Sequence, residues 1–259
     1  MESPISFYPQ AEAAAKRALE LDPTLAEAHT SLALLTQYYE LDWKGAEQQF
    51  RRAIELNSNE PEAHHMFSHY WMAVGDVSRS LEESRKALEI DPRAPSLVAH
   101  LAVHYLYARQ FDAAIAQARK ALELDPDFWI THRYLGWTFE QIKMFPEAIA
   151  ELTTVARLNR NNDESLASLG HVYASSGDTT HAEQLLRELK DRARQRYVSP
   201  YAIALIYVGL GQRDEAFVWL QRSLDDRIGV MPDLKLSPRL DPVRNDPRFL
   251  DLQRRAGLS

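Results

Sequence analysis

The chain has 259 residues, of which 45% are hydrophobic and 26% are charged, a composition typical of a folded protein with a sizeable core. Its 30 basic and 37 acidic side chains give a formal net charge of -7, so we expect no nucleic-acid partner, because phosphate binding needs a surplus of Lys and Arg. The lack of cysteine excludes disulfides, thiolate metal sites and a cysteine nucleophile. No apolar run is long enough to cross a bilayer, so we expect no membrane partner and a cytoplasmic location.

The first predicted element is a helix over residues 9–21. It ends at Asp22-Pro23, because proline lacks an N–H donor and clashes with the preceding turn. No upstream helix can pair with it, so residues 1–25 are predicted to form a half repeat with an open face. We expect that face to pack on an upstream part of a longer polypeptide or on a second copy of the chain. Alternatively, residues 1–8 fold back as a cap.

From residue 26 onward the sequence repeats itself every 34 residues. Equivalent alanines recur at this interval in two series, Ala53, Ala87 and Ala121, and then Ala114, Ala148, Ala182 and Ala216. The turn Asp-Pro recurs at the end of nearly the same sequence, ALELDP, ALEIDP and ALELDP. The interval before the second copy contains one extra residue, near residues 40–43. The repeat predicts six helical hairpins that start near residues 26, 61, 95, 129, 163 and 197.

Inside each unit, glycines and small residues keep a fixed phase. Gly75, Gly177 and Gly211 fall where a left-handed glycine can close the first helix of a hairpin. Bulky apolar residues recur at helical spacing beside a small residue in every unit. The small residues are Ala33, Ser68, Ala102, Gly136, Gly170 and Ala204. Large side chains against small ones let neighbouring helices approach closely.

These features resemble the tetratricopeptide repeat, a helix–turn–helix unit of 34 residues. The resemblance implies an all-α fold, a right-handed α-α superhelix. Its six units would cover residues 26–230, after the half repeat of residues 1–25. Ser58 and Arg160 replace the turn proline, which affects local turn geometry.

The last segment, residues 231–259, is rich in Pro, Asp and Arg and predicts a short capping helix over residues 247–255. Three sequence segments resemble the C-terminal repeat arrays of bacterial signalling proteins. They are DPVRNDPRFLDLQRRAGL in this tail, and LGWTFEQIKMFPEAIAEL and YVSPYAIALIYVGLGQRDEAFVWL before it. Those proteins are winged-helix regulators, Ser/Thr kinases and nucleotide cyclases. The resemblance implies a regulatory arm of a larger protein, while the plainer alternative is a tail that only covers the last hairpin.

In this family the first helices of the units line a concave groove. Carried over to this sequence, the groove positions hold Tyr38, His65, His69, Met72, Val103, Tyr107, Arg133, Trp137, Glu140, His171 and Tyr201. This surface is mostly aromatic and apolar. The charged clamp with which some family members hold chaperone tails is absent, since its positions carry residues such as Glu62, His65 and Ser96.

The groove therefore predicts a protein-interaction scaffold that binds an apolar peptide or helix. Tyr107, Trp137 and Tyr201 would be anchors, and Arg133 would orient a carboxylate or carbonyl. The alternative function is a sensor domain for a small molecule or short peptide. These rings could instead cover neighbouring helices, or a second copy of the chain could fill the groove.

Catalytic and metal-binding patterns are the remaining candidates. The chain has no G-x-S-x-G elbow, phosphate-binding glycine loop or H-E-x-x-H motif, so we expect neither an enzyme nor a cofactor. The pairs His65/His69 and His100/His104 have i, i+4 spacing on equivalent helices of adjacent units, so their four imidazoles could together hold zinc or nickel. Because histidines recur as packing residues at the fourth position of several units, and no Cys or carboxylate stands at ligand spacing, we expect no metal.

Overall fold

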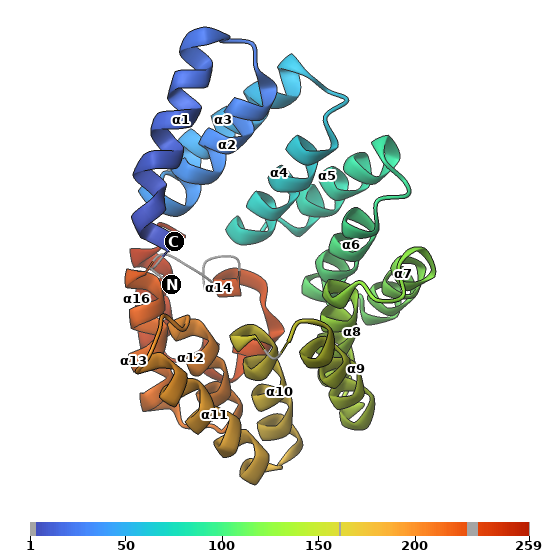
Figure 1. Cartoon of the computed structure of the whole chain (residues 1–259), viewed down its shortest axis with the longest axis vertical. Helices are drawn as coiled ribbons and strands as arrows, with labels where there is room; N and C mark the ends of the chain where they lie inside the picture. Colours follow the sequence, from blue (N-terminus) through green and yellow to red (C-terminus); the bar gives the residue numbers. More distant parts are fainter. Residues whose placement is uncertain (1–3, 161, 227–232, 259) are drawn as a thin grey trace.

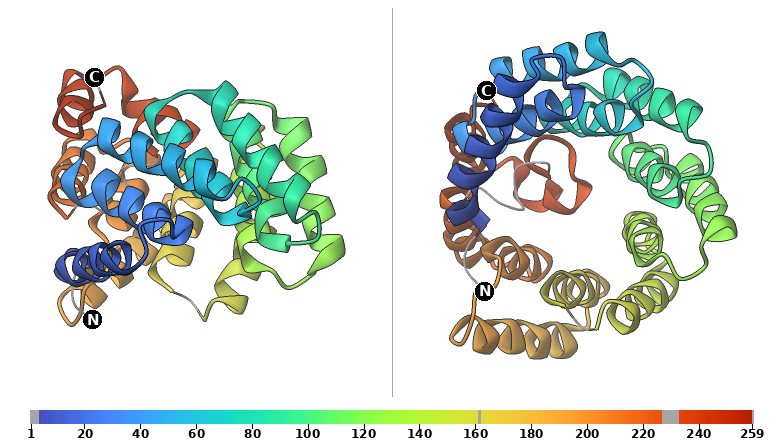
Figure 2. Two further views of the ribbon diagram at one scale, coloured as in Figure 1. Left: turned by 90° about the horizontal axis from the view of Figure 1, so that it is seen from above. Right: turned by 45° about the horizontal axis from the view of Figure 1, so that its top comes forward.

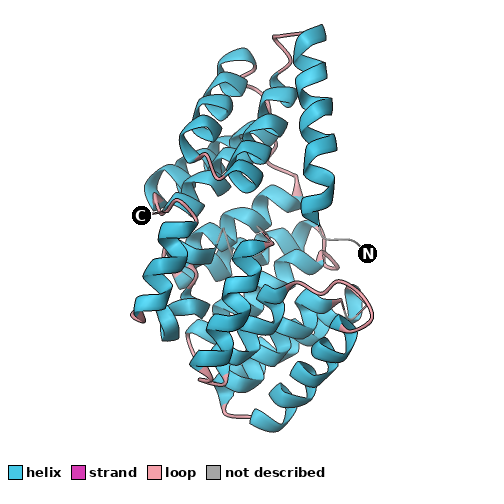
Figure 3. Cartoon of the chain, turned by 90° about the vertical axis from the view of Figure 1, so that its left-hand side faces the viewer, coloured by secondary structure: helices cyan, strands magenta, loops and turns pink. Residues whose placement is uncertain are grey.

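The computed structural model describes residues 4–160, 162–226 and 233–258, and every regular element in these ranges is helical (Figure 1, Figure 3). The predicted all-α repeat solenoid is therefore confirmed. None of the helices in these ranges is both long and apolar enough to span a bilayer.

Helix α1 (Tyr8–Leu21), preceded by a 3-10 turn at Pro4–Phe7, leads into a series of helical hairpins. The hairpins are α2 (Ala26–Leu35) with α3 (Trp43–Leu56), α4 (Pro61–Val74) with α5 (Val77–Ile90), α6 (Pro95–Tyr107) with α7 (Phe111–Leu124), α8 (Trp129–Gln141) with α9 (Phe145–Leu158), α10 (Asp163–Ser176) with α11 (Thr179–Ala193), and α12 (Pro200–Gly209) with α13 (Arg213–Asp225). The last hairpin begins at Pro200 and not near residue 197, because Pro200 takes the first helical position, where its missing N–H is not needed.

The C-terminal tail contains α14 (Asp233–Leu236), a 3-10 turn at Pro238–Leu240, α15 (Asp241–Arg244) and α16 (Pro247–Arg255). The last helix has the range that the sequence predicted. Helix α16 packs on α13, whereas α14 packs on α4, far away in the sequence. The tail therefore does more than cover the last hairpin.

The hairpins follow one another around a ring, with part of the tail inside it (Figure 2, right; red). The tail joins the two ends of the array: the indole N–H of Trp43 in α3 donates to the carbonyl of Ala256, at 2.7 Å. Phe50 of the first hairpin and Phe249 of α16, both fully buried, belong to the same apolar core cluster. The first and last hairpins thus share one core.

The extra residue in the first unit is absorbed by a π-helix. Residues Thr36–Glu40, which continue α2, form this wider helix, and the amide of Asp42 bonds to the carbonyl of Thr36 at 3.1 Å. A π-helical turn takes one more residue than an α-helical turn. The extra residue therefore lies one turn before the position that the sequence predicted, residues 40–43.

A left-handed residue follows the first helix in every unit. Gly75, Gly177 and Gly211 have φ of 91°, 91° and 69°, as their phase predicted. The same phase in the other units holds non-glycine residues with φ between 59° and 63°, namely Leu41, Arg109 and Lys143. The turn geometry is therefore set by the repeat even where the favourable residue is missing.

Histidines at the fourth position of several units brace the turn between units. His132 lies between the Glu151 carboxylate, 2.6 Å from Nδ1, and the Pro126 carbonyl, 2.9 Å from Nε2. His64 bonds to Glu83 in the same way, at 2.6 Å. Both neighbours of His132 are hydrogen-bond acceptors, which favour the protonated ring. They raise the pKa of His132, and Glu151 has the larger effect. The packing role predicted for these histidines is confirmed.

Gly136 is the point of closest approach within the fourth hairpin. A Cβ atom on it would lie 2.7 Å from Cγ of Leu152, which is fully buried and cannot move aside. We expect Gly136→Ala to lower the free energy of unfolding by about 1–3 kcal/mol, as overpacking usually does, measured by urea denaturation. In a Leu152→Ala background the same change should cost nothing; an equal cost in both backgrounds would contradict this account.

Candidate functional site

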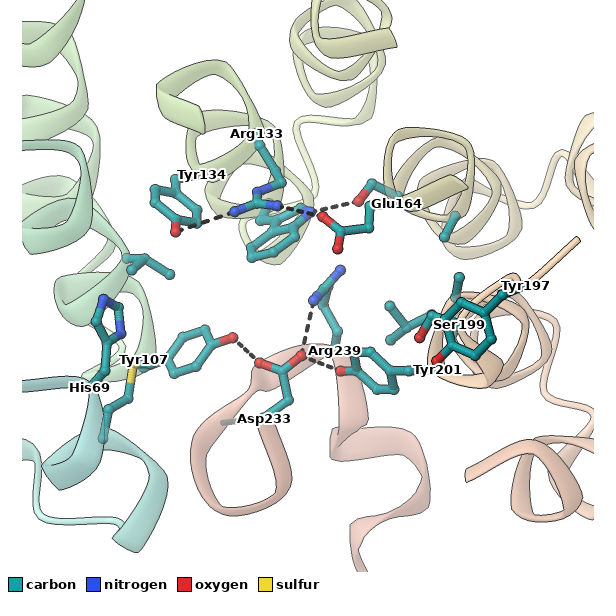
Figure 4. A pocket seen from close by; sticks show the side chains of 17 residues that line it. His69, Tyr107, Arg133, Tyr134, Glu164, Tyr197, Ser199, Tyr201, Asp233 and Arg239 are labelled. Atoms are coloured by element: carbon teal, nitrogen blue, oxygen red, sulfur yellow. Dashed lines mark hydrogen bonds and ion pairs between the residues drawn. The ribbon is translucent and has the colours of Figure 1, made fainter. Parts of the chain in front are cut away.

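The tail turns into the ring and presents Asp233 to side chains from distant hairpins (Figure 4). The hydroxyls of Tyr107 in α6 and Tyr201 in α12 both donate to the Asp233 carboxylate. The Arg239 guanidinium also donates to it, at 3.2 Å. Asp233 thus links two predicted groove anchors to the tail of the same chain.

This cluster is almost completely shielded from water. Arg239 is 3% exposed and Asp233 is 6% exposed. Burial first, and then the Asp233 charge, holds the pKa of both Tyr107 and Tyr201 well above its usual range, so both phenols keep their protons and donate. A buried ion pair of this kind needs such hydrogen bonds to offset the loss of hydration.

A cavity of about 380 Å³ lies beside the cluster. Side chains from α4, α6, α8, α10, α12 and the tail line it (Figure 4). Apart from the residues of the cluster, its lining includes His69, Met72, Val103, Arg133, Tyr134, Trp137, Glu164, Ser168 and Leu205. Two guanidinium groups face the ring of Trp137. The central carbon of Arg239 lies 3.7 Å from the ring centroid, and that of Arg133 lies 5.1 Å from it.

The two arginines have spare hydrogen-bonding capacity. Among the described residues, no partner accepts from Nε of Arg133 or from Nε and Nη1 of Arg239, although these atoms are buried. Arg133 donates to Glu164 at 3.1 Å, but the Glu164 side chain is 63% exposed. Because an unsatisfied buried donor costs about 1–3 kcal/mol, these atoms favour a ligand that carries acceptor oxygens.

The structure divides the predicted groove residues into two groups. His69, Met72, Val103, Tyr107, Arg133, Trp137 and Tyr201 line the cavity. Tyr38, His65, Glu140 and His171 do not. Glu140 and His171 bond to each other at 2.7 Å and are both buried, while Tyr38 packs against the core that joins the two ends of the array.

The expectation of an open groove with exposed anchors is corrected. Tyr107, Trp137 and Tyr201 are only 5%, 9% and 7% exposed. The reason is the tail, whose Asp233 accepts from both phenols and whose Arg239 covers the indole. The occupant of this part of the groove is the chain's own tail, for which the sequence predicted a capping helix and no contact with the groove.

Asp233 and Arg239 are the site residues that sequence reasoning missed. Both residues lie in a segment rich in Pro, Asp and Arg, a composition typical of a polar tail. The nearest signal was the pair of tyrosines in the groove, since a buried phenol usually needs a hydrogen-bond partner. No periodicity indicated which segment would supply that partner.

Comparison with known proteins agrees with this architecture. Residues 100–162 match the family described as Tetratricopeptide repeat, so this part of the chain contains repeats of this kind. Proteins with such repeats generally mediate interactions with other proteins or with peptides. No curated protein matches the chain.

Several solved structures share the fold. A Cut9–Hcn1 hetero-tetramer of the APC/C has a TM-score of 0.66 at 15% identity, over 96% of this chain and 46% of that chain. The human IFIT1 dimer with m7Gppp-AAAA has a TM-score of 0.65 at 17% identity, over 97% and 61%. PilW, a type IV pilus biogenesis factor, has a TM-score of 0.61 at 19% identity, over 73% and 87%. At these identities the likeness shows the fold alone.

Proposed function

We propose that this chain is an interaction scaffold that takes the carboxylate-bearing end or side chain of a short peptide into the cavity beside its tail. The observation that supports this most strongly is that two arginine side chains, Arg133 and Arg239, line the same aromatic cavity. Guanidinium groups bind carboxylates through paired, charge-assisted hydrogen bonds. The rings of Tyr134 and Trp137 supply the apolar contact for the rest of the peptide.

The tail that encloses the cavity favours a short segment over a helix. Asp233 accepts from Tyr107 and Tyr201, and Arg239 lies over Trp137, so the tail already occupies this part of the groove. A docked helix would therefore require the tail to leave the ring. This refines the helix-binding prediction: peptide ends and single side chains fit the structure as it stands.

Glu164 competes with an anionic ligand for Arg133. Its exposed carboxylate holds one amino group of Arg133, at 3.1 Å. Because the Glu164 side chain is 63% exposed, it can be hydrated when an entering carboxylate displaces it. The ligand would then gain Arg133 while Glu164 turns to solvent.

The binding test is a comparison of peptides with free and amidated C-termini, by fluorescence polarisation. For Arg133→Gln we expect binding of the free carboxylate to weaken by about 1.5–3 kcal/mol, roughly 10- to 100-fold. The matched control is Arg222→Gln, since Arg222 also stacks on a tryptophan, Trp219 at 4.6 Å, but lies outside the cavity. Equal loss in both variants, or no preference for free carboxylates, would contradict the proposal.

The second candidate function is a sensor of small anionic molecules. Two features of the cavity favour the sensor. Asp233 and Arg239 enclose it, and its volume lies in the range of about 300–1,000 Å³ that small-molecule sites occupy. A rise in melting temperature with aromatic carboxylates, and none with peptides, would select the sensor over the scaffold.

Two narrower proposals rest on the sequence. The resemblance of residues 231–259 supports a role as the regulatory arm of a larger signalling protein, which the sequence of the full-length parent would test.

Helix α1 supports association with a second copy of the chain. Leu21 at its end is 72% exposed, and Phe7, which directly precedes the helix, is 53% exposed. Light scattering that gives the monomer mass would contradict the association.

A further inference from the structure

Four histidines from two successive hairpins meet in the wall of the ring. His65 and His69 belong to α4, and His100 and His104 belong to α6. The ring centroid of His65 lies 4.5 Å from that of His100, and the centroid of His69 lies 5.0 Å from His100 and 4.9 Å from His104. Sequence spacing gave the two pairs, and the packing of α4 on α6 brings them together.

Three of these side chains have the spacing of metal ligands. One ring nitrogen from each of His65, His69 and His100 lies within 4.8 Å of the other two. The Nε2 atoms of His65 and His69 are 3.1 Å apart. Two imidazole nitrogens bound to one Zn²⁺ at about 2.0–2.1 Å in tetrahedral geometry are separated by roughly 3.4 Å, so only small side-chain movements are needed.

Hydrogen bonds already orient two of the three rings for metal binding. Nδ1–H of His100 donates to the Ser96 carbonyl at 2.7 Å, because a carbonyl can only accept. Nδ1–H of His65 donates to the Glu62 carboxylate at 3.2 Å. In both rings the lone pair is therefore left on Nε2. A metal-bound histidine usually donates its other ring N–H to a carboxylate or carbonyl in this way.

We propose that His65, His69 and His100 form a three-histidine site for a divalent transition-metal ion of the Zn²⁺ class. Three imidazoles with no thiolate suit zinc, nickel or copper, and a three-histidine set leaves a further position for water or for a ligand. The proposal departs from the sequence-based expectation of no metal, which rested on the missing Cys and carboxylate ligands. It does not depend on the peptide-binding proposal.

His69 and His104 can accommodate the ion by a change of tautomer. Without metal, His69 donates from Nε2 to Nε2 of His65, since the latter holds a lone pair. When metal binds, the proton of His69 moves to Nδ1, which faces Nε2 of His104 at 3.4 Å. His104 in turn donates from Nδ1 to the Ser80 hydroxyl, 3.2 Å away. All four rings stay neutral, so no proton has to leave the protein.

The charges around the site act in opposite directions. Burial and the neighbouring rings lower the pKa of His69 and His100 well below the usual value, which keeps both in the neutral form that binds metal. Arg133 faces His100 and opposes a cation, whereas the Glu62 carboxylate on His65 favours one. Because the Glu62 side chain is 60% exposed, it offsets only part of the Arg133 charge.

The test is a titration of the chelator-treated full chain with Zn²⁺ by calorimetry and with Co²⁺ by visible absorption. We expect one ion per chain, a rise in Tm that saturates at one equivalent, and the absorption bands of four-coordinate Co²⁺. His65→Gln and His100→Gln should each weaken metal binding by more than the roughly 10- to 100-fold that the loss of a ligand's hydrogen-bond partner costs. Glu62→Gln should fall within that range.

His181→Gln is the matched control, because His181 lies outside the cluster and is exposed to solvent. Circular dichroism on each variant shows whether it is folded, and His65 and His100 can be replaced separately if one change impairs folding. The proposal is overturned if Zn²⁺ and Co²⁺ give neither heat nor a Tm shift, or if His181→Gln weakens binding as much as His100→Gln. Arg133→Gln should leave metal binding intact or strengthen it, which separates this site from peptide binding.

Discussion

Replacing Asp233 with asparagine is expected to lower the free energy of unfolding by about 3–5 kcal/mol, the usual cost of removing one partner of a buried ion pair. The variant leaves the Arg239 guanidinium, which is 3% exposed, without the charge of the carboxylate to which it donates. It also leaves a single acceptor oxygen for the hydroxyls of Tyr107 and Tyr201. Urea denaturation followed by circular dichroism measures the loss.

Asp241→Asn is the control for this prediction, since Asp241 lies in the same tail but its side chain is 44% exposed. Its pair with Arg109, at 2.8 Å, should contribute at most about 1 kcal/mol. Replacing both charges, Asp233→Leu with Arg239→Met, should recover only part of the stability, because it removes the unpaired charge but leaves the hydroxyls of Tyr107 and Tyr201 without an acceptor. A loss below about 1 kcal/mol for Asp233→Asn would show that the cluster contributes no more than an exposed pair.

Acidification from pH 7.5 to pH 5 is expected to destabilise the metal-free chain strongly. Burial lowers the pKa of His104 to about 3, and burial with the neighbouring rings lowers the pKa of His69 and His100 well below the usual value of 6.5. Between pH 6.5 and pH 3 the unfolded chain therefore binds more protons than the folded chain, so the free energy of unfolding falls as the pH falls. For His104 the cost should be about 2 kcal/mol by pH 5, and His69 and His100 should act in the same direction.

Urea denaturation at several pH values in the presence of a chelator measures this dependence. His104→Gln should reduce the slope of stability against pH by about one proton. His132→Gln should have the opposite effect, because Glu151 raises the pKa of His132, whose contribution is present at low pH and is lost above its folded-state pKa. If His104→Gln leaves the slope unchanged, His104 is not the neutral buried group described here.

The hairpins could be predicted because each depends on contacts within one or two repeat lengths. The phase of Gly75, Gly177 and Gly211 gave the left-handed turns, and the small residue at Gly136 gave the close approach to Leu152. In the first unit the 34-residue spacing is interrupted, and there the sequence located the extra residue only to within one helical turn. Whether that residue widens a helix or lengthens a loop is decided by packing around Thr36–Glu40.

The site could be predicted only in part, because it is formed by segments distant in the sequence. The repeat phase correctly placed Arg133 and Trp137 on the first helices, where both line the cavity. It could not show that Asp233 would reach Tyr107, 126 residues away. That contact depends on the accumulated curvature of six hairpins, which no local pattern of residues specifies.

The histidine cluster shows the same division between local and distant information. Helical spacing placed His65 beside His69 and His100 beside His104. The repeat phase also placed the two pairs on adjacent helices, and the decision against metal rested on the packing role of other histidines and on the missing Cys and carboxylate ligands. The distances that select His65, His69 and His100 as a set of three appear only when α4 and α6 are placed together.

The bond between Trp43 and Ala256 has a consequence for how the molecule loses its structure. In a linear array, the terminal repeats have one neighbour each and melt first, so that unfolding proceeds inwards in stages. Here the first and last hairpins have each other as neighbours through the tail. Fraying from either end is thereby suppressed, and amide hydrogen exchange should find the outer repeats opening together with the middle ones.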